Sequence, residues 1–591
     1  MKRYTLLVMA AMLCGVITGC SSESTTATDK AGKPAEIDVT FYSGGRLIPG
    51  DGSAPIDEAT FIVENGKITQ VGTKNEVKPP KGSGRVELNG QTIMPVLANL
   101  HGHVGLNNGS SFGPENYKRD SVVADLNRYG YYGVSAVAVQ GSDATDLASQ
   151  IRDEQAHGKA TGSRIFTSGR GFTAKGGYPT ALMKDIPIQV STEAEARKGV
   201  DQQADKKVDL ISMWVEDNMG RSPKLKPEVY RAIIDEAHKR NLKVFSTVFS
   251  LADAKDLVKS GVDVLTTSIR DKEVDDELVS MMKQKGTYYT PALTGLEAKF
   301  VYADKPNWLG EQTMREVYPA QLSAYLADTV TMNRFKRNPD QPALREQFVV
   351  AKKNLKKMAD GGVKVALGTD SGTPDTYPGY FELRELALMG EAGMAPGDVI
   401  KAATSTSAEA LGLKDQGVLA AGKKGDFIVL TSNPLEKIAN SKEISVIYMN
   451  GNELDRGSLI QNITIDVPRI TQKDRQADAA AEAEAARLAA EAKLEHFGKF
   501  ILGPSANVRG VPIPTPKGSK ADVKPGPPAS VTVSMRASAA DLREFYVKAL
   551  PKYRWAAAGN CWERTNPVSN KLQSACLNTS ANNAVIQISE K

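Results

Sequence analysis

Two histidines separated by a single glycine, His101 and His103, come directly after the apolar run 93–100. Residues two apart on an extended strand point to the same side, so both imidazoles can bind one metal ion. The chain has five histidines in all, and two of them stand in this pair. Because an H-x-H pair alone is a weak signal, its meaning depends on the element that carries it.

Eight apolar runs of strand type alternate with amphipathic segments across the middle of the chain, and one of these segments, 228–239, has its apolar residues at helical spacing. Alternating strands and helices predict a parallel sheet, and eight such units predict an α/β protein built on a (β/α)8 TIM-like barrel. The histidine pair then lies at the carboxyl end of the first strand, where such barrels carry their chemistry. The eight runs are 93–100, 134–139, 165–168, 208–213, 243–248, 262–267, 287–293 and 363–369.

Short β-type runs flank the predicted barrel on both sides. Before it, the runs 59–63 and 68–71 are separated by a turn with Asn65 and Gly66, which predicts a hairpin. After it, similar runs return at 426–430 and 446–454. We therefore expect two parts, 36–92 and 409–468, to form one small split β-sandwich closed around a barrel that spans 93–408.

The composition changes after residue 468. An Ala-, Glu- and Arg-rich stretch at 476–494 predicts an exposed helix, and seven prolines between 504 and 528 predict irregular structure. We assign 469–528 to a helical and Pro-rich spacer and 529–591 to a small C-terminal α+β domain. Cys561 and Cys576 fall in this domain, and in an exported chain we expect them to form a disulfide; the alternative is two free buried thiols.

The N-terminus predicts an export signal. Lys2 and Arg3 precede an apolar run at 6–13 that is too short to span a bilayer. Residues 17–20 (ITGC) resemble the lipobox of bacterial lipoproteins, in which the cysteine is lipidated and becomes the new N-terminus. This resemblance implies a signal peptide at 1–19, lipidation of Cys20, a tether at 20–35, and a protein anchored in the bacterial cell envelope. Ser21, where an inner-membrane protein would carry Asp, favours the outer membrane facing the periplasm. The alternative is an ordinary cleaved signal with a chance cysteine.

Composition excludes several other classes of protein. The net charge of +5 arises from 74 basic and 69 acidic residues spread along the chain, which argues against a nucleic-acid partner. Four cysteines in 591 residues exclude a disulfide scaffold and a zinc site built mainly from thiolates. With 41% hydrophobic residues, the chain can bury a large core.

Several ordered motifs resemble the metal-dependent amidohydrolase superfamily, in the branch of imidazolonepropionase-like and prolidase-like enzymes. The resemblance covers residues 36–455 and supports the barrel with a split sandwich. The motifs are HGH at 101–103, GRGFTAKGG at 169–177, DEAHKR at 235–240, GTDSGT at 368–373, AAT at 402–404 and GKKGD at 422–426.

The family's metal centre uses H-x-H on strand one, a lysine on strand four, single histidines on strands five and six, and an aspartate on strand eight. His101, His103 and Asp370 match this pattern, whereas other residues stand at the remaining positions. These are Ser212 for the strand-four lysine, Thr247 and Thr267 for the two histidines, and Tyr178 where many relatives carry histidine. A threonine hydroxyl is a much weaker ligand than imidazole, so a bridged two-metal centre is not expected.

The retained residues predict a hydrolase with one divalent metal ion, with zinc favoured, held by His101, His103 and Asp370. By resemblance, Asp370 is both ligand and catalytic proton acceptor, and the substrate is a small molecule with an amide or cyclic amide carbon–nitrogen bond. We expect further acid, base or charge-stabilising groups among four residues just beyond two predicted strands. They are Glu216 and Asp217 after strand four, and Arg270 and Asp271 after strand six.

The alternative is a pocket without metal in a catalytically inactive barrel. The chain would then be a binding or scaffold lipoprotein of the envelope, with a protein partner on the C-terminal domain.

Overall fold

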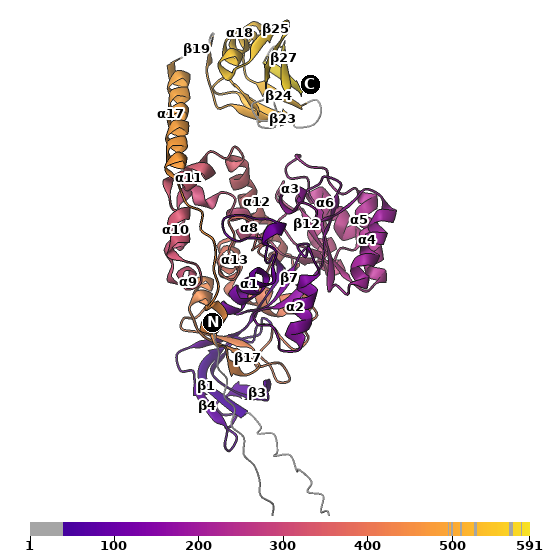
Figure 1. Cartoon of the computed structure of the whole chain (residues 1–591), viewed down its shortest axis with the longest axis vertical. Helices are drawn as coiled ribbons and strands as arrows, with labels where there is room; N and C mark the ends of the chain where they lie inside the picture. Colours follow the sequence, from indigo (N-terminus) through magenta and orange to yellow (C-terminus); the bar gives the residue numbers. More distant parts are fainter. Residues whose placement is uncertain are drawn as a thin grey trace, which may run out of the picture.

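The computed structural model describes residues 39–494, 496–497, 500–508, 511–524, 529–565, 571–580 and 582–590 (Figure 1). The expected signal peptide, the tether to residue 35 and the lipidation site Cys20 lie outside these residues. Among the described residues, no helix combines the length and the apolar character needed to cross a bilayer.

The two β-rich segments that flank the barrel form one sheet. Its order is β18–β17–β16–β5–β1–β2–β3, with β4 paired to β1. The hairpin predicted at Asn65 and Gly66 is present, and both turn residues have positive φ angles of 49° and 78°. The segment before the barrel and the segment after it meet where β16 runs antiparallel to β5. The strands are β1 (Val39–Leu47), β2 (Ile56–Glu64), β3 (Lys67–Thr73), β4 (Gly84–Glu87), β5 (Thr92–Pro95), β16 (Phe427–Leu430), β17 (Ile444–Met449) and β18 (Asn452–Glu453).

The middle of the chain forms the predicted barrel of parallel strands. A three-stranded ladder and five strands of a seven-stranded ladder share its wall, and the other two strands of the larger ladder, β9 (Phe172–Ala174) and β10 (Ile188–Val190), extend it beyond β11. The ladders join where the Asp209 amide donates to the Thr167 carbonyl and where Leu100 donates to Leu367, each at 2.8 Å. All eight predicted runs contribute one wall strand. These strands are β6 (Leu97–Gly102), β7 (Val134–Val139), β8 (Arg164–Thr167), β11 (Leu210–Val215), β12 (Lys243–Val248), β13 (Val264–Leu265), β14 (Tyr288–Tyr289) and β15 (Lys364–Val365).

Several wall strands are shorter than their apolar runs. The run 93–100 divides between β5 of the flanking sheet and β6 of the barrel. The run 287–293 leaves the ladder at Pro291, which has no amide hydrogen to donate, and Ala292 then takes a positive φ of 46°. The chain turns there into helix α8 (Leu293–Glu297). Apolar residues near the barrel mouth thus serve packing in loops and helices as well as strands.

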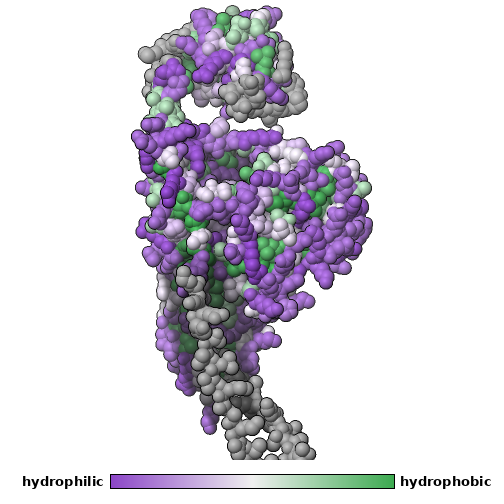
Figure 2. All heavy atoms as spheres, viewed as in Figure 1, coloured by the Kyte–Doolittle hydropathy of each residue, from purple (hydrophilic) through white to green (hydrophobic). Residues whose placement is uncertain are grey.

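Helices cover the outside of the barrel. One of them, α5 (Pro227–Lys239), forms from the segment predicted to be an amphipathic helix. A long helical insertion lies between α8 and β15. Figure 2 shows mainly hydrophilic residues on the outer surface in that view, with hydrophobic residues in scattered patches. The insertion contains α9 (Gln312–Arg315), α10 (Ala320–Leu326), α11 (Thr329–Lys336) and α12 (Gln341–Asp360). It is followed after β15 by α13 (Tyr380–Glu391).

Helix α17 (Gln472–Leu494) leads from the barrel to the C-terminal unit (Figure 1). Its first half is attached to the region of α11 by two ion pairs, Arg475 with Asp328 at 2.9 Å and Asp478 with Arg337 at 2.7 Å. The predicted exposed helix is therefore present, and one end of it is held against the barrel's helical insertion.

The C-terminal unit has its own hydrophobic core between a six-stranded sheet and helix α18 (Ala539–Ala549). The expectation of irregular structure up to residue 528 is wrong, because β21 (Ala506–Val508), β22 (Val511–Ile513) and β23 (Lys520–Lys524) lie in this range. Pro512 sits in a two-stranded ladder, where a missing amide is tolerated at an edge, and Val508 and Ile513 pack into the core. The sheet order is β23–β24–β28–β27–β26–β25, with β24 (Ala529–Ser534), β25 (Ala556–Ala558), β26 (Cys561–Thr565), β27 (Leu572–Ser580) and β28 (Asn583–Glu590).

Cys561 and Cys576 form a disulfide across β26 and β27, where the two residues stand directly opposite each other with Cα atoms 4.2 Å apart.

Candidate metal centre and substrate pocket

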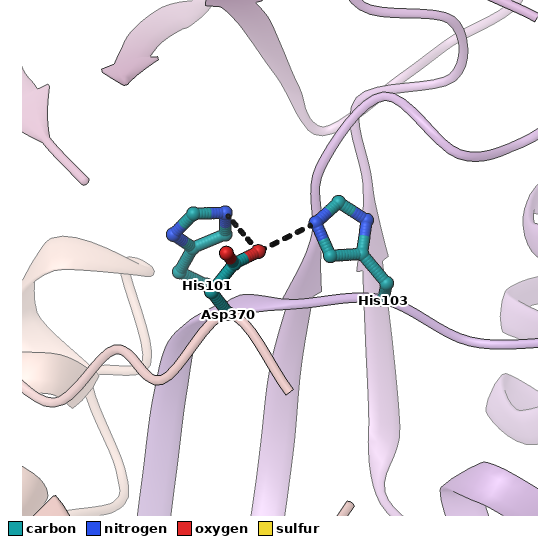
Figure 3. A group of neighbouring side chains, drawn as sticks. All are labelled: His101, His103 and Asp370. Carbon is teal, nitrogen blue, oxygen red and sulfur yellow. Dashed lines mark hydrogen bonds and ion pairs between the residues drawn. The ribbon is translucent and has the colours of Figure 1, made fainter. Parts of the chain in front are cut away.

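The three predicted ligands meet at the mouth of the barrel (Figure 3). His101 lies in β6, His103 follows that strand, and Asp370 follows β15, so the first and last strands of the wall supply all three. Oδ1 of Asp370 lies 3.1 Å from Nε2 of His103 and 3.5 Å from Nε2 of His101. The histidine side chains are 1% and 2% exposed, and that of Asp370 is 20% exposed, which leaves the carboxylate on the open side of the group.

The backbone at Asp370 is bent to bring its carboxylate to the histidines. Asp370 has a φ angle of 59°, in the left-handed region, and its amide donates to the carbonyl of His101 at 2.9 Å. Gly295 of α8 lies close by, and a Cβ there would be 2.8 Å from the Cβ of Asp370. A glycine at this position is what allows the helix and the aspartate loop to approach so closely.

Glu382 of α13 holds the residues on either side of Asp370. Its buried carboxylate accepts hydrogen bonds from Thr369 Oγ1 at 2.6 Å and Ser371 Oγ at 2.7 Å. It also accepts from Asn99 Nδ2 at 2.8 Å, which links β6 to the same network. Burial raises the pKa of Glu382, while these hydrogen bonds oppose the rise. The loop that presents Asp370 is therefore fixed by one buried acid.

The imidazole of His101 is oriented by a backbone carbonyl. Nδ1 of His101 lies 2.6 Å from the carbonyl oxygen of Thr266, which can only accept, so Nδ1 carries the hydrogen. The other nitrogen, Nε2, then presents a lone pair toward Asp370. Burial lowers the pKa of His101 to about 4, against the opposing influence of Asp370. His101 is therefore a neutral ligand at neutral pH.

The carboxyl group of Asp370 is ionised at neutral pH. Burial alone raises the pKa of its carboxyl, but interaction with the neighbouring His101 and His103 side chains lowers it to about 2. Nδ1 of His103 is buried and has no hydrogen-bond partner among the described residues. With a metal ion bound, the hydrogen of His103 would sit on Nδ1, and Nε2 of each histidine and one carboxylate oxygen of Asp370 would be the three electron-pair donors.

The donor set fits a single divalent ion. The ligand atoms of the three residues lie within 4.8 Å of one another, and among the described residues no other group of three His, Cys, Asp or Glu side chains does so. Two ligands at about 2.1 Å from a tetrahedral ion are about 3.4 Å apart, close to the two separations measured here. Two histidines with one carboxylate is a donor set that zinc accepts, with one position left for water.

A cavity of about 200 Å³ opens above these ligands. It is smaller than the roughly 300–1,000 Å³ of pockets that hold drug-sized molecules, which favours a small ligand. Its apolar lining residues include Phe112, Leu182, Met183, Trp214 and Leu296. Its polar lining residues include Tyr178, Glu216, Thr247, Thr267, Arg270 and Lys299.

Neutral side chains stand at positions 212, 247 and 267, where the family resemblance would place a lysine and two histidines. The Ser212 hydroxyl is hydrogen-bonded to Ser168 Oγ at 2.8 Å. The Thr267 hydroxyl donates to the carbonyl of Val248, and that of Thr247 is buried without a partner in the described structure. Trp214 fills the space beside Ser212, because a Cβ on Gly171 would lie 2.4 Å from its indole ring.

Of the four additional charged candidates, the structure brings two together. Arg270 Nη2 donates to Glu216 Oε2 at 3.0 Å, and both side chains are nearly buried in the pocket wall. Asp217 instead accepts from the amide of Gly220 within its own loop, and Asp271 accepts from the amide of Leu251. These two aspartates do not line the cavity.

Sequence reasoning missed Trp214 and Lys299. Trp214 lies two residues beyond Ser212 on the same strand, so strand alternation places both side chains toward the barrel interior. Lys299 lies just beyond α8, in the helical insertion, and only the folded position of that insertion brings it over the cavity.

Residues 142–454 match the model of the amidohydrolase family, and this match covers more than half of the chain. The chain therefore belongs to the amidohydrolase family.

Individual relatives are distant. Ochratoxinase of Aspergillus niger is 24% identical over 469 residues, which cover 71% of this chain and 88% of that protein. Imidazolonepropionase of Deinococcus deserti is 36% identical over 85 residues, or 14% of this chain and 21% of that protein. Among solved structures, a Xaa-Pro dipeptidase with bound methionine aligns with a TM-score of 0.58 and 21% identity, covering 71% of this chain and all of that one. At this identity the likeness shows a shared fold.

Proposed function

We propose that this protein is a metal-dependent hydrolase of carbon–nitrogen bonds in small amide or cyclic amide substrates, with one divalent ion held by His101, His103 and Asp370. The observation that carries the proposal is the convergence of these three donors at 3.1 and 3.5 Å beneath a small cavity. The chemistry that a zinc-type ion supplies at such a site is Lewis-acid activation of a water molecule at neutral pH. Zinc is favoured because the donor set is two imidazoles and one carboxylate.

The chain's own residues supply the remaining roles. Asp370 is ionised and 20% exposed toward the cavity, so one of its oxygens can accept a proton from the attacking water. Tyr178 lines the cavity, and burial together with Glu216 and Asp370 raises its pKa, so its hydroxyl keeps its proton. A protonated phenol can donate a hydrogen bond to the oxygen that gains charge as the amide carbonyl is attacked.

The site supports one ion rather than a bridged pair. Ser212 is hydrogen-bonded to Ser168, and Thr247 and Thr267 offer only neutral hydroxyls. Trp214 occupies the adjoining space. No nitrogen or carboxylate donor for a second ion is therefore present among these positions.

Metal analysis tests the proposal directly. The purified chain is expected to bind about one equivalent of zinc per molecule and to hydrolyse members of an amide and lactam library. His103→Ala should lose both properties. His238→Ala is the matched control, since His238 lies on the outer helix α5 and pairs with Asp263 at 2.9 Å. Absence of bound metal in the parent chain, or turnover that His103→Ala leaves intact, would contradict the proposal.

We also propose that the protein is exported and lipid-anchored at Cys20 in the bacterial envelope. The disulfide between Cys561 and Cys576 supports an oxidising compartment. Metabolic labelling with a fatty acid analogue, followed by Cys20→Ser, tests the anchor. Label incorporated equally by both forms would refute it.

A second candidate function is a binding protein of the envelope with an inactive barrel. It draws on the neutral residues at 212, 247 and 267 and on the separate core of the C-terminal unit. This candidate predicts that capture of an envelope protein survives His103→Ala and Asp370→Ala. Metal-dependent turnover abolished by those changes would exclude it.

A further inference from the structure

The pocket wall near the three ligands carries several charges, and most of them are already paired. Glu216 is bound to Arg270 at 3.0 Å, and Asp370 faces the two histidines. Burial raises the pKa of Asp375, which also lines the cavity, and the charge of Arg334 opposes that rise. Because these charged groups already interact with other groups of the protein, they do not require a charged group on the ligand.

Lys299 is the exception. It lines the cavity and is exposed, and its ammonium group has no hydrogen bond or ion pair among the described residues. The nearest acid in its own segment, Glu297, is bound to Arg384 at 2.6 Å. Burial and the charge of Arg270 lower the pKa of this ammonium group, while Glu216 and Asp370 oppose the decrease. Lys299 therefore places an ammonium group without a partner among the described residues on the wall of the proposed active site.

We propose that Lys299 binds a carboxylate of the substrate, so that the substrates are small amides bearing a free carboxylate, such as N-acyl amino acids. This inference rests on the proposed function, because it names the class of molecule that the same pocket takes. A charge-assisted hydrogen bond from an ammonium group is the interaction that an unpaired lysine in a pocket can offer a ligand.

The rest of the wall fits the remainder of such a molecule. Phe112, Leu182 and Leu296 supply an apolar surface for an aliphatic or aromatic side group. Lys299 and Asp370 line the same small cavity, so a carboxylate on Lys299 can belong to the same small molecule as an amide over the ligands. The cavity of about 200 Å³ limits the molecule to a single amino acid with a modest acyl group.

Binding of paired probes tests the inference without requiring turnover. Isothermal titration of the full chain, metal-free and zinc-loaded, would compare N-acetyl-L-phenylalanine and N-acetyl-L-leucine with their carboxamides. The parent chain should bind each carboxylate about tenfold or more tightly than its carboxamide, the factor expected for one charge-assisted hydrogen bond. Lys299→Gln should remove this preference, and Lys299→Glu should reverse it.

The control variant is Lys336→Gln, which changes an exposed lysine of α11 outside the cavity and should keep the preference. Thermal melts of both lysine variants check that they fold. No preference in the parent chain, no binding of either carboxylate, or a preference that survives Lys299→Gln overturns the inference.

The proposed function is judged separately. Zinc-dependent hydrolysis of neutral amides with no preference for a carboxylate keeps the hydrolase and overturns the role of Lys299. Carboxylate binding through Lys299 in a chain that holds no metal and hydrolyses no amide supports the binding site and overturns the hydrolase.

Discussion

Nε2 of His103 lies 3.1 Å from Oδ1 of Asp370, although 267 positions separate the two residues in the chain. The contact exists because the barrel closes between β6 and β15, with Gly102 bridged to Ser371. A site made by this closure depends on whatever holds the two strand ends in place.

Removal of Glu382 should loosen that closure. Glu382→Ala leaves the hydroxyls of Thr369 and Ser371 and the amide of Asn99 without their buried acceptor, which we expect to cost about 3 kcal/mol or more of stability. Zinc affinity should fall as well, because Asp370 lies between two of these residues. Urea unfolding and metal titration measure both effects. Glu391→Ala, at the exposed end of α13, is the control, and equal losses in the two variants would contradict the role of Glu382.

Tyr178→Phe should slow the reaction while leaving metal binding intact. The change removes one hydroxyl from the cavity wall, and loss of a donor to developing negative charge lowers kcat by about a hundredfold in comparable sites. Steady-state kinetics on any library substrate, with zinc content measured in parallel, checks this expectation. An unchanged kcat would show that the phenol takes no part.

Glu385 of α13 should make stability depend on pH. Burial raises the pKa of its carboxyl from 4.5 to about 7, although the amides of Leu293 and Thr294 donate to it. The folded state thus keeps a proton that the unfolded chain has already lost, so its stabilising contribution is complete below about pH 4.5 and is lost as the pH rises through about 7.

The comparison that isolates this effect is Glu385→Gln, because an amide does not titrate in this range. The free energy of unfolding of the parent chain should drop more between pH 5 and pH 8 than that of Glu385→Gln. Equal drops would mean that Glu385 does not titrate in this window.

Loss of the disulfide should weaken the C-terminal unit alone. Cys561 and Cys576 close a loop with a sequence separation of 15, which stabilises a fold by about 3 kcal/mol in the loop-entropy model. The double change Cys561→Ala with Cys576→Ala should lower the melting transition of that unit. The barrel transition and zinc binding should stay where they are, because the unit has a separate core. A shift of both transitions would show that the two cores unfold together.

The sequence was sufficient for the barrel, which rests on local patterns, and the family resemblance was sufficient to name His101, His103 and Asp370 as a group that lies together. Alternating apolar runs predicted each wall strand, and 134–139 and 243–248 match β7 and β12 residue for residue. The same reasoning failed at the prolines after 504, where short strands form because Val508 and Ile513 pack into a tertiary core. The high proline content of this stretch disfavours strands, but packing of its apolar side chains into the core outweighs that preference.

The surroundings of the ligands could not be predicted in the same way. Glu382 lies twelve positions after Asp370 on a helix, and no pattern marks it as the acceptor for residues from two strand ends. Lys299 looks like any other surface lysine in sequence until α8 places it over the cavity. Both depend on distances between distant segments, which short motifs do not contain.

The packing of Trp214 limits what position 212 can hold. Its indole ring packs against Gly171 and Gly141, where the absence of side chains leaves room. The Ser212 hydroxyl also lies close to Gly171. A lysine placed at 212 would compete with the ring for that space, and the threonines at 247 and 267 would still lack imidazoles. Installing a second-ion site in this barrel would therefore require a smaller side chain at 214 together with new ligands at all three positions.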